Sequence, residues 1–282
     1  MILVFGKTGQ VARELARLVP EARYLGREDA DLSDPAACAA AIAAHRPEAV
    51  INAAAYTAVD RAETDAARAT LINGAAPVAM ARACAALAVP FVHISTDYVF
   101  DGAGSEPFTP DHPTAPLNAY GRSKLIGEDG VRSAGGAHVI LRTSWVFSAH
   151  GNNFVRTMLR LGAERDYLRV VADQIGGPTP ARAIASACLH IVKQLHDAPA
   201  KSGTYHFAGA PETSWAGFAR AIMAEAGLAC RIDEIASAEY PTPARRPMNS
   251  RLDCSGLSAL GLTRPDWREH LHTLITDLKG SQ

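Results

Sequence analysis

The sequence predicts an α/β fold with a parallel, doubly wound sheet, and two observations carry this prediction. Short apolar, β-branched runs recur between longer helical patterns, and the first of these runs leads directly into a glycine-rich turn. Such alternation favours parallel strands that are joined by right-handed helical crossovers. The predicted strands are residues 2–5, 49–51, 91–94 and 139–141.

The segments between these runs predict the helices. Val11, Leu15 and Leu18 keep helical spacing, and residues 35–45 and 66–87 suit buried crossover helices. Beyond about residue 145 helices and strands mix, and the last helix is amphipathic. The elements expected there are helices at 153–161 and 181–195, a helix capped by Ser214 that runs to Ala224, strands at 168–171 and 205–207, and a final helix carrying Leu271, Leu274 and Leu278.

Composition excludes several classes of protein. The chain is 48% hydrophobic and has 28 basic and 29 acidic residues, so no overall field favours nucleic acid or an anionic membrane. Its five cysteines are scattered and lack a C-x-x-C pair, which suits reduced thiols in a cytosol. We find no signal peptide and no uninterrupted apolar run of about 18 residues. A cytoplasmic protein with a small-molecule ligand is expected.

The first predicted strand runs into a phosphate-binding type of turn. Residues 6–12 read G-K-T-G-Q-V-A, in which Gly6 and Gly9 let diphosphate oxygens approach backbone N–H groups at a helix N-terminus. The spacing differs from the G-x-G-x-x-G fingerprint and Ala12 replaces its last glycine, so a plain turn stays the alternative. We predict a Rossmann-type dinucleotide-binding domain at residues 1–145, with later segments returning to it, and a smaller mixed α/β lobe at 146–282 that mainly binds substrate.

A further strand, the second along the chain, is expected to end at residues 24–27, and its end indicates the coenzyme. Gly26 supplies no carboxylate for a ribose 2′-hydroxyl, and Arg27 offers a planar cation that suits a 2′-phosphate. We therefore favour NADPH, and the neighbouring Glu28 and Asp29 keep NADH open. The next two candidates, which either flank the adenine or belong to the start of the following helix, are Asp31 and Leu32.

Two further patterns predict a proton-transfer centre. Thr96 follows the strand at 91–94, and ligands bind at the carboxyl ends of parallel strands. Tyr120 and Lys124 form Y-x-x-x-K, whose i,i+4 spacing puts phenol and ammonium on one helical face. The cation would stabilise a phenolate, and the Thr96 hydroxyl would stabilise a developing alkoxide. A surface pair on a solvated helix is the alternative.

Nearly the whole chain resembles the extended short-chain dehydrogenase/reductase family, and most closely its reductases of dTDP-linked keto sugars. The resemblance lies in residues 5–10, 52–60, 95–100, 143–146, 151–154, 173–174 and 240–252. It implies reduction of the 4-keto group of dTDP-4-dehydro-L-rhamnose to dTDP-L-rhamnose by hydride from NADPH, for bacterial surface polysaccharides. In that reading Tyr120 donates the proton, Lys124 tunes Tyr120 and holds the nicotinamide ribose, and Thr96 orients the keto group.

The resemblance also implies ligand contacts. The cofactor would meet Gly6, Thr8, Gly9, Gln10, Val11, Ala55, Tyr56 and Thr57. The sugar pocket would be lined by Asp97, Tyr98 and Val99. Trp145 would cover the substrate, with core filling as the alternative. Arg246 and Arg251 are candidate clamps for the nucleotide diphosphate, because guanidinium binds phosphate bidentately, and ordinary solvated arginines are the alternative.

Three questions stay open at this point. Some relatives form dimers with magnesium between subunits, but Arg182 stands where such a site would want a carboxylate. We expect no catalytic metal, and leave a structural magnesium and a homodimer open. An epimerase of the same fold, which returns its hydride to the sugar, is one alternative function. A non-catalytic protein resembling the regulatory β-subunit of methionine adenosyltransferase is the other.

Overall fold

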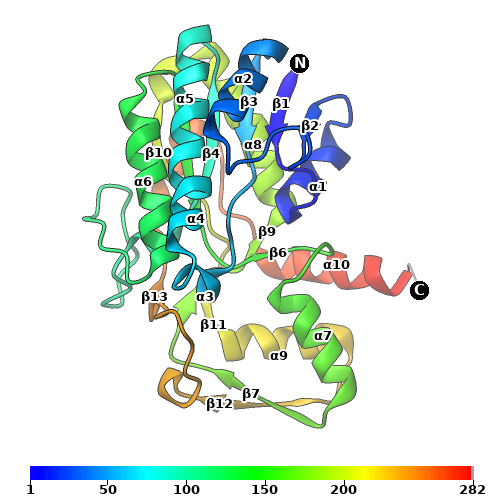
Figure 1. Ribbon diagram of the computed structural model, residues 1–282. Coiled ribbons are helices and arrows are strands. Elements are labelled where there is room, and N and C mark those ends of the chain that lie inside the picture. Colours follow the sequence, from blue (N-terminus) through cyan, green and yellow to red (C-terminus); the bar gives the residue numbers. More distant parts are fainter. Residues whose placement is uncertain (281–282) are drawn as a thin grey trace.

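The computed structural model describes residues 1–280 as a sheet lobe and a smaller lobe below it (Figure 1). The sheet has six parallel strands in the order β10-β5-β4-β3-β1-β2. Successive strands are added on one side of β1 up to β2 and on its other side from β3 onward. The gap between β1 and β3 is therefore the switch point at which such folds bind ligands. The strands are β1 (Ile2–Phe5), β2 (Arg23–Leu25), β3 (Ala49–Asn52), β4 (Phe91–Thr96), β5 (His138–Thr143) and β10 (Gly203–His206). The predicted fold class is confirmed.

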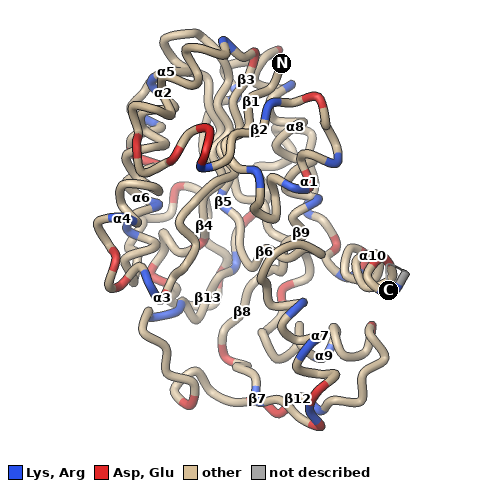
Figure 2. The backbone as a smooth tube through the Cα atoms, turned by 45° about the vertical axis from the view of Figure 1, so that its right-hand side comes forward, with Lys and Arg blue, Asp and Glu red and all other residues tan. Residues whose placement is uncertain are grey.

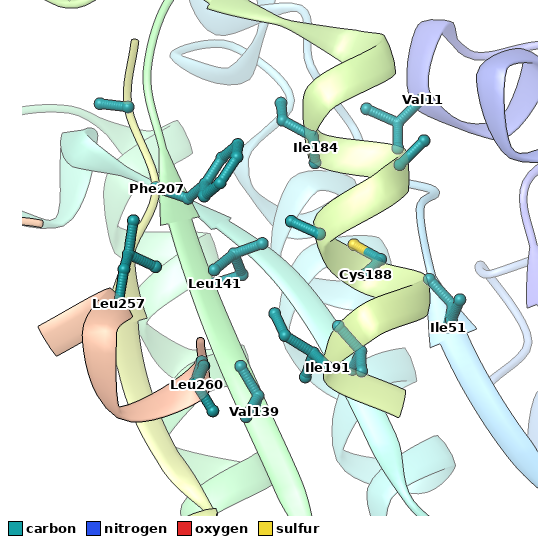
Figure 3. Packing of buried hydrophobic residues seen from close by; sticks show 14 of the residues in the cluster. Val11, Ile51, Val139, Leu141, Ile184, Cys188, Ile191, Phe207, Leu257 and Leu260 are labelled. Atoms are coloured by element: carbon teal, nitrogen blue, oxygen red, sulfur yellow. The ribbon is translucent and has the colours of Figure 1, made fainter. Parts of the chain in front are cut away.

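Helices cover both faces of this sheet, because alternate strand residues point to opposite sides. Val4 and Leu141 belong to the cluster under α1 (Gln10–Leu18) and α8 (Ala181–Asp197). Figure 3 shows Ile184, Cys188 and Ile191 of α8 facing this side of β5. Leu3 and Ile140 belong to the opposite cluster. The helices on that side are α2 (Pro35–His45), α5 (Ala76–Leu87) and α6 (Ala119–Ser133).

The single helix predicted at residues 66–87 is interrupted. It consists of α4 (Ala66–Thr70), a π-helical turn η1 (Leu71–Ala75) and α5. Pro77 cannot donate to the Asn73 carbonyl one turn earlier, and the buried Asn73 side chain bonds elsewhere, so the turn widens. By length and composition alone the stretch could span a membrane, a test that core helices also pass. Here it packs against α2 and α6.

The smaller lobe has its own apolar core, which includes Phe147, Phe218 and Trp267. Side chains cap two of its helices: Asn153 accepts from Arg156 N–H and Ser214 accepts from Gly217 N–H, the latter as predicted. Its helices are α7 (Phe154–Glu164), α9 (Trp215–Ala226) and α10 (Trp267–Gly280). A parallel ladder of β7 (Tyr167–Val171) and β12 (Arg231–Ile235) completes it.

Short ladders join the two lobes. One pairs β6 (Val146–Phe147) with β9 (Thr179–Pro180), and the other places β8 (Ile175–Gly176) between β11 (Thr213–Ser214) and β13 (Asn249–Ser250). The remaining turns are α3 (Val59–Ala62), η2 (Asp97–Val99), η3 (Pro199–Lys201), η4 (Ser237–Glu239) and η5 (Ser255–Leu260). Figure 2 shows acidic and basic residues interspersed over both lobes, in keeping with a net charge of −1. The last two residues of the predicted lobe lie outside the described residues.

Candidate active site

A cleft of about 1190 Å³ runs along the carboxyl ends of the central strands. The structure brings together in its lining most of the residues that the sequence predicts: Gly6, Thr8, Gly9, Gln10, Val11, Arg27, Asp31, Leu32, Ala55, Tyr56, Thr57, Thr96, Asp97, Tyr98, Tyr120, Lys124 and Trp145. The glycine loop, the Y-x-x-x-K helix and the end of β4 therefore share one cavity. Their roles toward a ligand stay predictions.

The glycine loop forms a close approach of two backbones. Gly6 has φ +118°, and a Cβ there would lie 3.2 Å from the Ala53 carbonyl. Gly9 begins α1 in an extended conformation and has no side chain to cap the helix, so the N-terminal partial positive charge faces the cleft. The Gln10 side chain instead accepts from Ser148 and Asn153 and ties the loop to the smaller lobe.

Cations gather at the adenosine end predicted for the cleft. Arg27 is exposed there, and Lys7 lies 2.8 Å from Glu28, whose hydrogen bond raises the pKa of Lys7. The Asp31 carboxylate accepts the Ser33 N–H, while the next helix is capped by Asp34. Polar cleft residues that were not predicted from the sequence include Lys7, Arg61, Arg68, Ser144 and Asn152. The signal for Lys7 was its place inside the glycine loop.

Hydroxyl groups meet where β4 ends. The Thr96 hydroxyl donates to Asp97 over 3.1 Å and accepts the Tyr98 N–H, and the Tyr120 phenol lies in the same buried group. Burial raises the pKa of Tyr120 well above its ordinary value, the nearby Thr96 hydroxyl partly offsets this, and Asp97 adds to it. Burial also raises the pKa of Asp97 to about 6, against hydrogen bonds from Ser250 and Thr96. Tyr120 therefore keeps its proton at neutral pH and is suited to act as an acid.

Lys124 is fixed at the floor of the cleft. Its Nζ donates to the Ile94 carbonyl over 2.7 Å and lies 3.3 Å from His93 Nε2. Burial lowers the pKa of Lys124 to about 8, although Glu128 raises it. Burial dominates the pKa of Tyr120 in the ligand-free protein, and the expected tuning of Tyr120 by Lys124 stays a prediction.

Trp145 lies at the junction of the lobes in a strained conformation. Its φ is +49°, a region that bulky residues rarely occupy. The indole stacks on Trp215 of α9, with ring centres 3.6 Å apart and planes 11° apart. Gly176 makes room for it, because a Cβ there would lie 2.8 Å from the ring. The stack supports Trp145 at the edge of the cleft.

Three predicted substrate residues lie outside the cleft lining. Val99 is fully buried in the core, because the tight turn of η2 directs it away from Asp97 and Tyr98. Arg246 pairs with Asp60 at 2.7 Å and contacts the Tyr98 hydroxyl, so it holds its own segment against α3. The guanidinium of the third residue, Arg251, bonds its neighbour Asn249. None of the three lines this cavity, and their predicted contacts with substrate stay predictions.

A buried amide that the sequence reasoning missed positions one wall. Asn73 accepts the Tyr56 N–H over 2.8 Å, donates to the Tyr56 carbonyl over 3.0 Å, and donates to Ser123 over 2.9 Å. This clamp fixes the loop after β3 against the catalytic helix α6. Its only sequence signal was an asparagine inside an apolar helical pattern.

A buried ion pair holds α6 on the sheet. Arg142 of β5 is 2% exposed and reaches Glu128 with Nε and Nη2, the latter at 2.7 Å. Ser95 donates to the same carboxylate over 2.6 Å, next to Thr96. Burial raises the pKa of Glu128, but the hydrogen bonds and charge of Arg142 outweigh it and hold that pKa below its ordinary value. Within residues 1–280, no three His, Cys, Asp or Glu side chains are grouped to hold a metal ion.

Comparisons with known proteins agree with this geometry. The model of the RmlD substrate binding domain family matches residues 1–279. A dTDP-4-dehydrorhamnose reductase from Burkholderia thailandensis is 46% identical over 98% of both chains, and one from Escherichia coli K12 is 39% identical over 98% of this chain and 97% of its own. The crystal structure of dTDP-4-dehydrorhamnose reductase from Bacillus anthracis in complex with NADP superimposes with a TM-score of 0.91, at 33% identity over 98% of both chains.

Proposed function

The chain belongs to the RmlD substrate binding domain family, and we propose that it reduces the 4-keto group of dTDP-4-dehydro-L-rhamnose to dTDP-L-rhamnose with NADPH. It is an NAD(P)H-dependent oxidoreductase, as its relatives over nearly the full chain are dTDP-4-dehydrorhamnose reductases. The observation that carries the proposal is that Thr96, Tyr120 and Lys124 line the same cleft as the glycine loop. The epimerase and the non-catalytic binding protein are not favoured.

The residues present fit a dinucleotide. The cavity volume, the Gly6 close approach and the uncapped start of α1 suit a diphosphate between two nucleosides. Arg27 and Lys7 lie where the sequence predicts the adenosine ribose, and their charges favour the 2′-phosphate of NADPH over NADH. When bound, NADPH supplies the hydride.

The chain's own groups supply the proton and the orientation. Tyr120 holds its proton at neutral pH because burial raises its pKa, so it can donate to the oxygen that becomes the sugar 4-hydroxyl. The Thr96 hydroxyl hydrogen-bonds the same oxygen and stabilises its developing charge. Lys124, one helical turn from Tyr120, holds the nicotinamide ribose. Trp145 and the lobe at residues 146–282 cover the sugar nucleotide and exclude water.

The test is the stoichiometry of NADPH oxidation, followed by absorbance, with dTDP-4-dehydro-L-rhamnose. The reductase proposal expects one NADPH consumed for each sugar reduced. An epimerase would convert the sugar without net consumption of NADPH, and a binding protein would show affinity without turnover. Folded protein that binds NADPH but consumes none with this sugar would refute the proposal.

Location and assembly belong to the same proposal. We propose a cytoplasmic enzyme without nucleic-acid or membrane partners, supported by the near-neutral net charge and by five free, buried cysteines. We also propose a homodimer, and the molar mass of the purified protein, measured by light scattering, tests this. Magnesium has no part in the proposed chemistry, and equal activity in chelator and in magnesium is the expected result.

A further inference from the structure

A chain of buried hydrogen bonds connects the backbone after β3 to the catalytic lysine. The Ala54 N–H donates to Asn52 Oδ1 over 3.2 Å, and Asn52 Nδ2 lies 3.1 Å from His93 Nδ1. His93 Nε2 in turn lies 3.3 Å from Lys124 Nζ. Asn52, His93 and Lys124 are 1%, 0% and 2% exposed, so water does not replace these contacts. This series of hydrogen bonds is therefore a fixed, buried part of the site.

The direction of these hydrogen bonds follows from their first member. A backbone N–H only donates, so the carbonyl oxygen of Asn52 faces Ala54 and its amide group donates to His93 Nδ1. Burial is the main cause that lowers the pKa of His93 well below its ordinary value, so the ring is neutral. A neutral imidazole that accepts at Nδ1 carries its hydrogen on Nε2. That N–H points at Lys124.

The donor at His93 Nε2 decides whether the neutral amine or the ammonium form of Lys124 fits the contact. An ammonium has only donors, so at His93 Nε2 it would set one donor against another. A neutral amine accepts the Nε2–H and still donates to the Ile94 carbonyl. We propose that His93 is a positioning residue whose Nε2–H favours the neutral amine form of Lys124 in the cofactor-free protein, so that binding of the anionic coenzyme shifts Lys124 toward the ammonium and takes up a proton from solvent.

The charged surroundings of Lys124 agree with this proposal. On its own helix Glu128 raises the pKa of Lys124, but Arg142 from β5 and Arg132 from α6 neutralise that carboxylate. Beyond the end of β4, the Asp97 carboxylate raises the pKa of Tyr120, but it is not among the influences on the pKa of Lys124. Among the described residues, burial is therefore the dominant influence on Lys124. A diphosphate brought into the cleft adds negative charge, which favours the ammonium.

The experiment measures protonation in cofactor-free protein by NMR. The chain has five lysines (Lys7, Lys124, Lys193, Lys201 and Lys279), so ¹³C labelling at the ε-carbon gives few signals, and Lys124→Arg assigns the relevant one. We expect Lys124 to titrate well below its ordinary value of 10.5. Ring ¹⁵N shifts of His93 are expected to report the Nε2–H tautomer, and this measurement needs no variant.

Two variants separate the donor from mere packing. His93→Met fills the space without a donor and should raise the Lys124 midpoint by about one pH unit, the size of one hydrogen bond. His93→Gln keeps an amide donor toward Lys124 and should restore the wild-type midpoint. The pH profile of NADPH oxidation should shift in His93→Met and not in His93→Gln. Calorimetry of NADPH binding at about pH 8, near the Lys124 midpoint, in buffers of different ionisation enthalpy should show proton uptake in the wild type.

The results that overturn the proposal are equally defined. An Nδ1–H tautomer of His93, a wild-type Lys124 midpoint near 10.5, or an unchanged midpoint in folded His93→Met would each do so. The functional consequence rests on the proposed reductase activity, but the titration uses neither coenzyme nor sugar. A protein that fails to oxidise NADPH could still show the lowered Lys124 midpoint and the Nε2–H tautomer of His93, so the two failures are distinguishable.

Discussion

Replacing Arg142 with methionine removes the cation of the buried ion pair that holds the catalytic helix on the sheet. Glu128 then loses three contacts, from Arg142 Nε to both carboxylate oxygens and from Nη2 at 2.7 Å. It keeps only the Ser95 hydroxyl at 2.6 Å and the half-exposed Arg132 at 3.2 Å. The Pro110 carbonyl also loses its donor. A buried carboxylate without its main partner is the expected source of instability.

The magnitude follows from burial. Removing one partner of a buried ion pair costs about 3–5 kcal/mol, and an unpaired carbonyl adds about 1–3 kcal/mol. Because Ser95 and Arg132 remain, we expect a loss near the lower part of this sum, about 4 kcal/mol of the free energy of unfolding at pH 7. The pKa of Glu128 is lowered in the folded wild type, so its contribution is full above the ordinary value of 4.5 and is lost as the pH falls through the folded pKa. The difference between wild type and variant should therefore shrink below about pH 4.5.

Urea unfolding followed by circular dichroism measures this free energy. Arg132→Ala is the matched control, because it removes a partner of the same carboxylate whose side chain is 37% exposed. Such an exposed pair is worth about 0–1 kcal/mol. If Arg142→Met costs no more than Arg132→Ala, or if its cost does not depend on pH, the reasoning on the buried pair is refuted.

Three other perturbations test how the site is built. Gly121→Ala places a Cβ about 2.1 Å from the Tyr98 carbonyl, so α6 must shift. We expect kcat to fall at least about tenfold in steady-state kinetics, and an unchanged kcat would contradict the close approach. Asn73→Ala leaves the Tyr56 N–H and carbonyl without their Asn73 partner, which should lower the free energy of unfolding by about 1–3 kcal/mol. The Kd of NADPH, measured by fluorescence titration, should rise. An unchanged Kd would show that the Asn73 contacts do not support coenzyme binding. Arg27→Ala should weaken NADPH binding more than NADH binding, and equal effects on the two Kd values would exclude a 2′-phosphate role.

Periodicity made most of the fold predictable. The inner strands β1, β3, β4 and β5 are short, carry apolar runs and are mostly buried, whereas the edge strands β2 and β10 are not. In α10, the buried Leu271 and Leu274 form the predicted stripe. The interruption at η1 depends on Pro77 and on the tertiary contacts of Asn73, which local pattern does not contain. Propensity alone therefore predicts one continuous helix there.

The site was predictable where its residues carry a motif. The glycine loop and the Y-x-x-x-K pair are local, and the parallel sheet brings them to one edge. The partners of the arginines are set only by the fold: Asp60, which pairs with Arg246, is 186 residues away. The same holds for His93, whose contact with Lys124 joins a strand to a helix.

The most direct test of the account is the rate of hydride transfer in Tyr120→Phe, measured in a single turnover with saturating NADPH and dTDP-4-dehydro-L-rhamnose. The account predicts a fall of about 10²–10⁴-fold, because the general acid is lost, with a Kd for NADPH that changes by no more than about twofold. A folded variant whose single-turnover rate stays within about threefold of the wild type would contradict the assignment of Tyr120 as the acid.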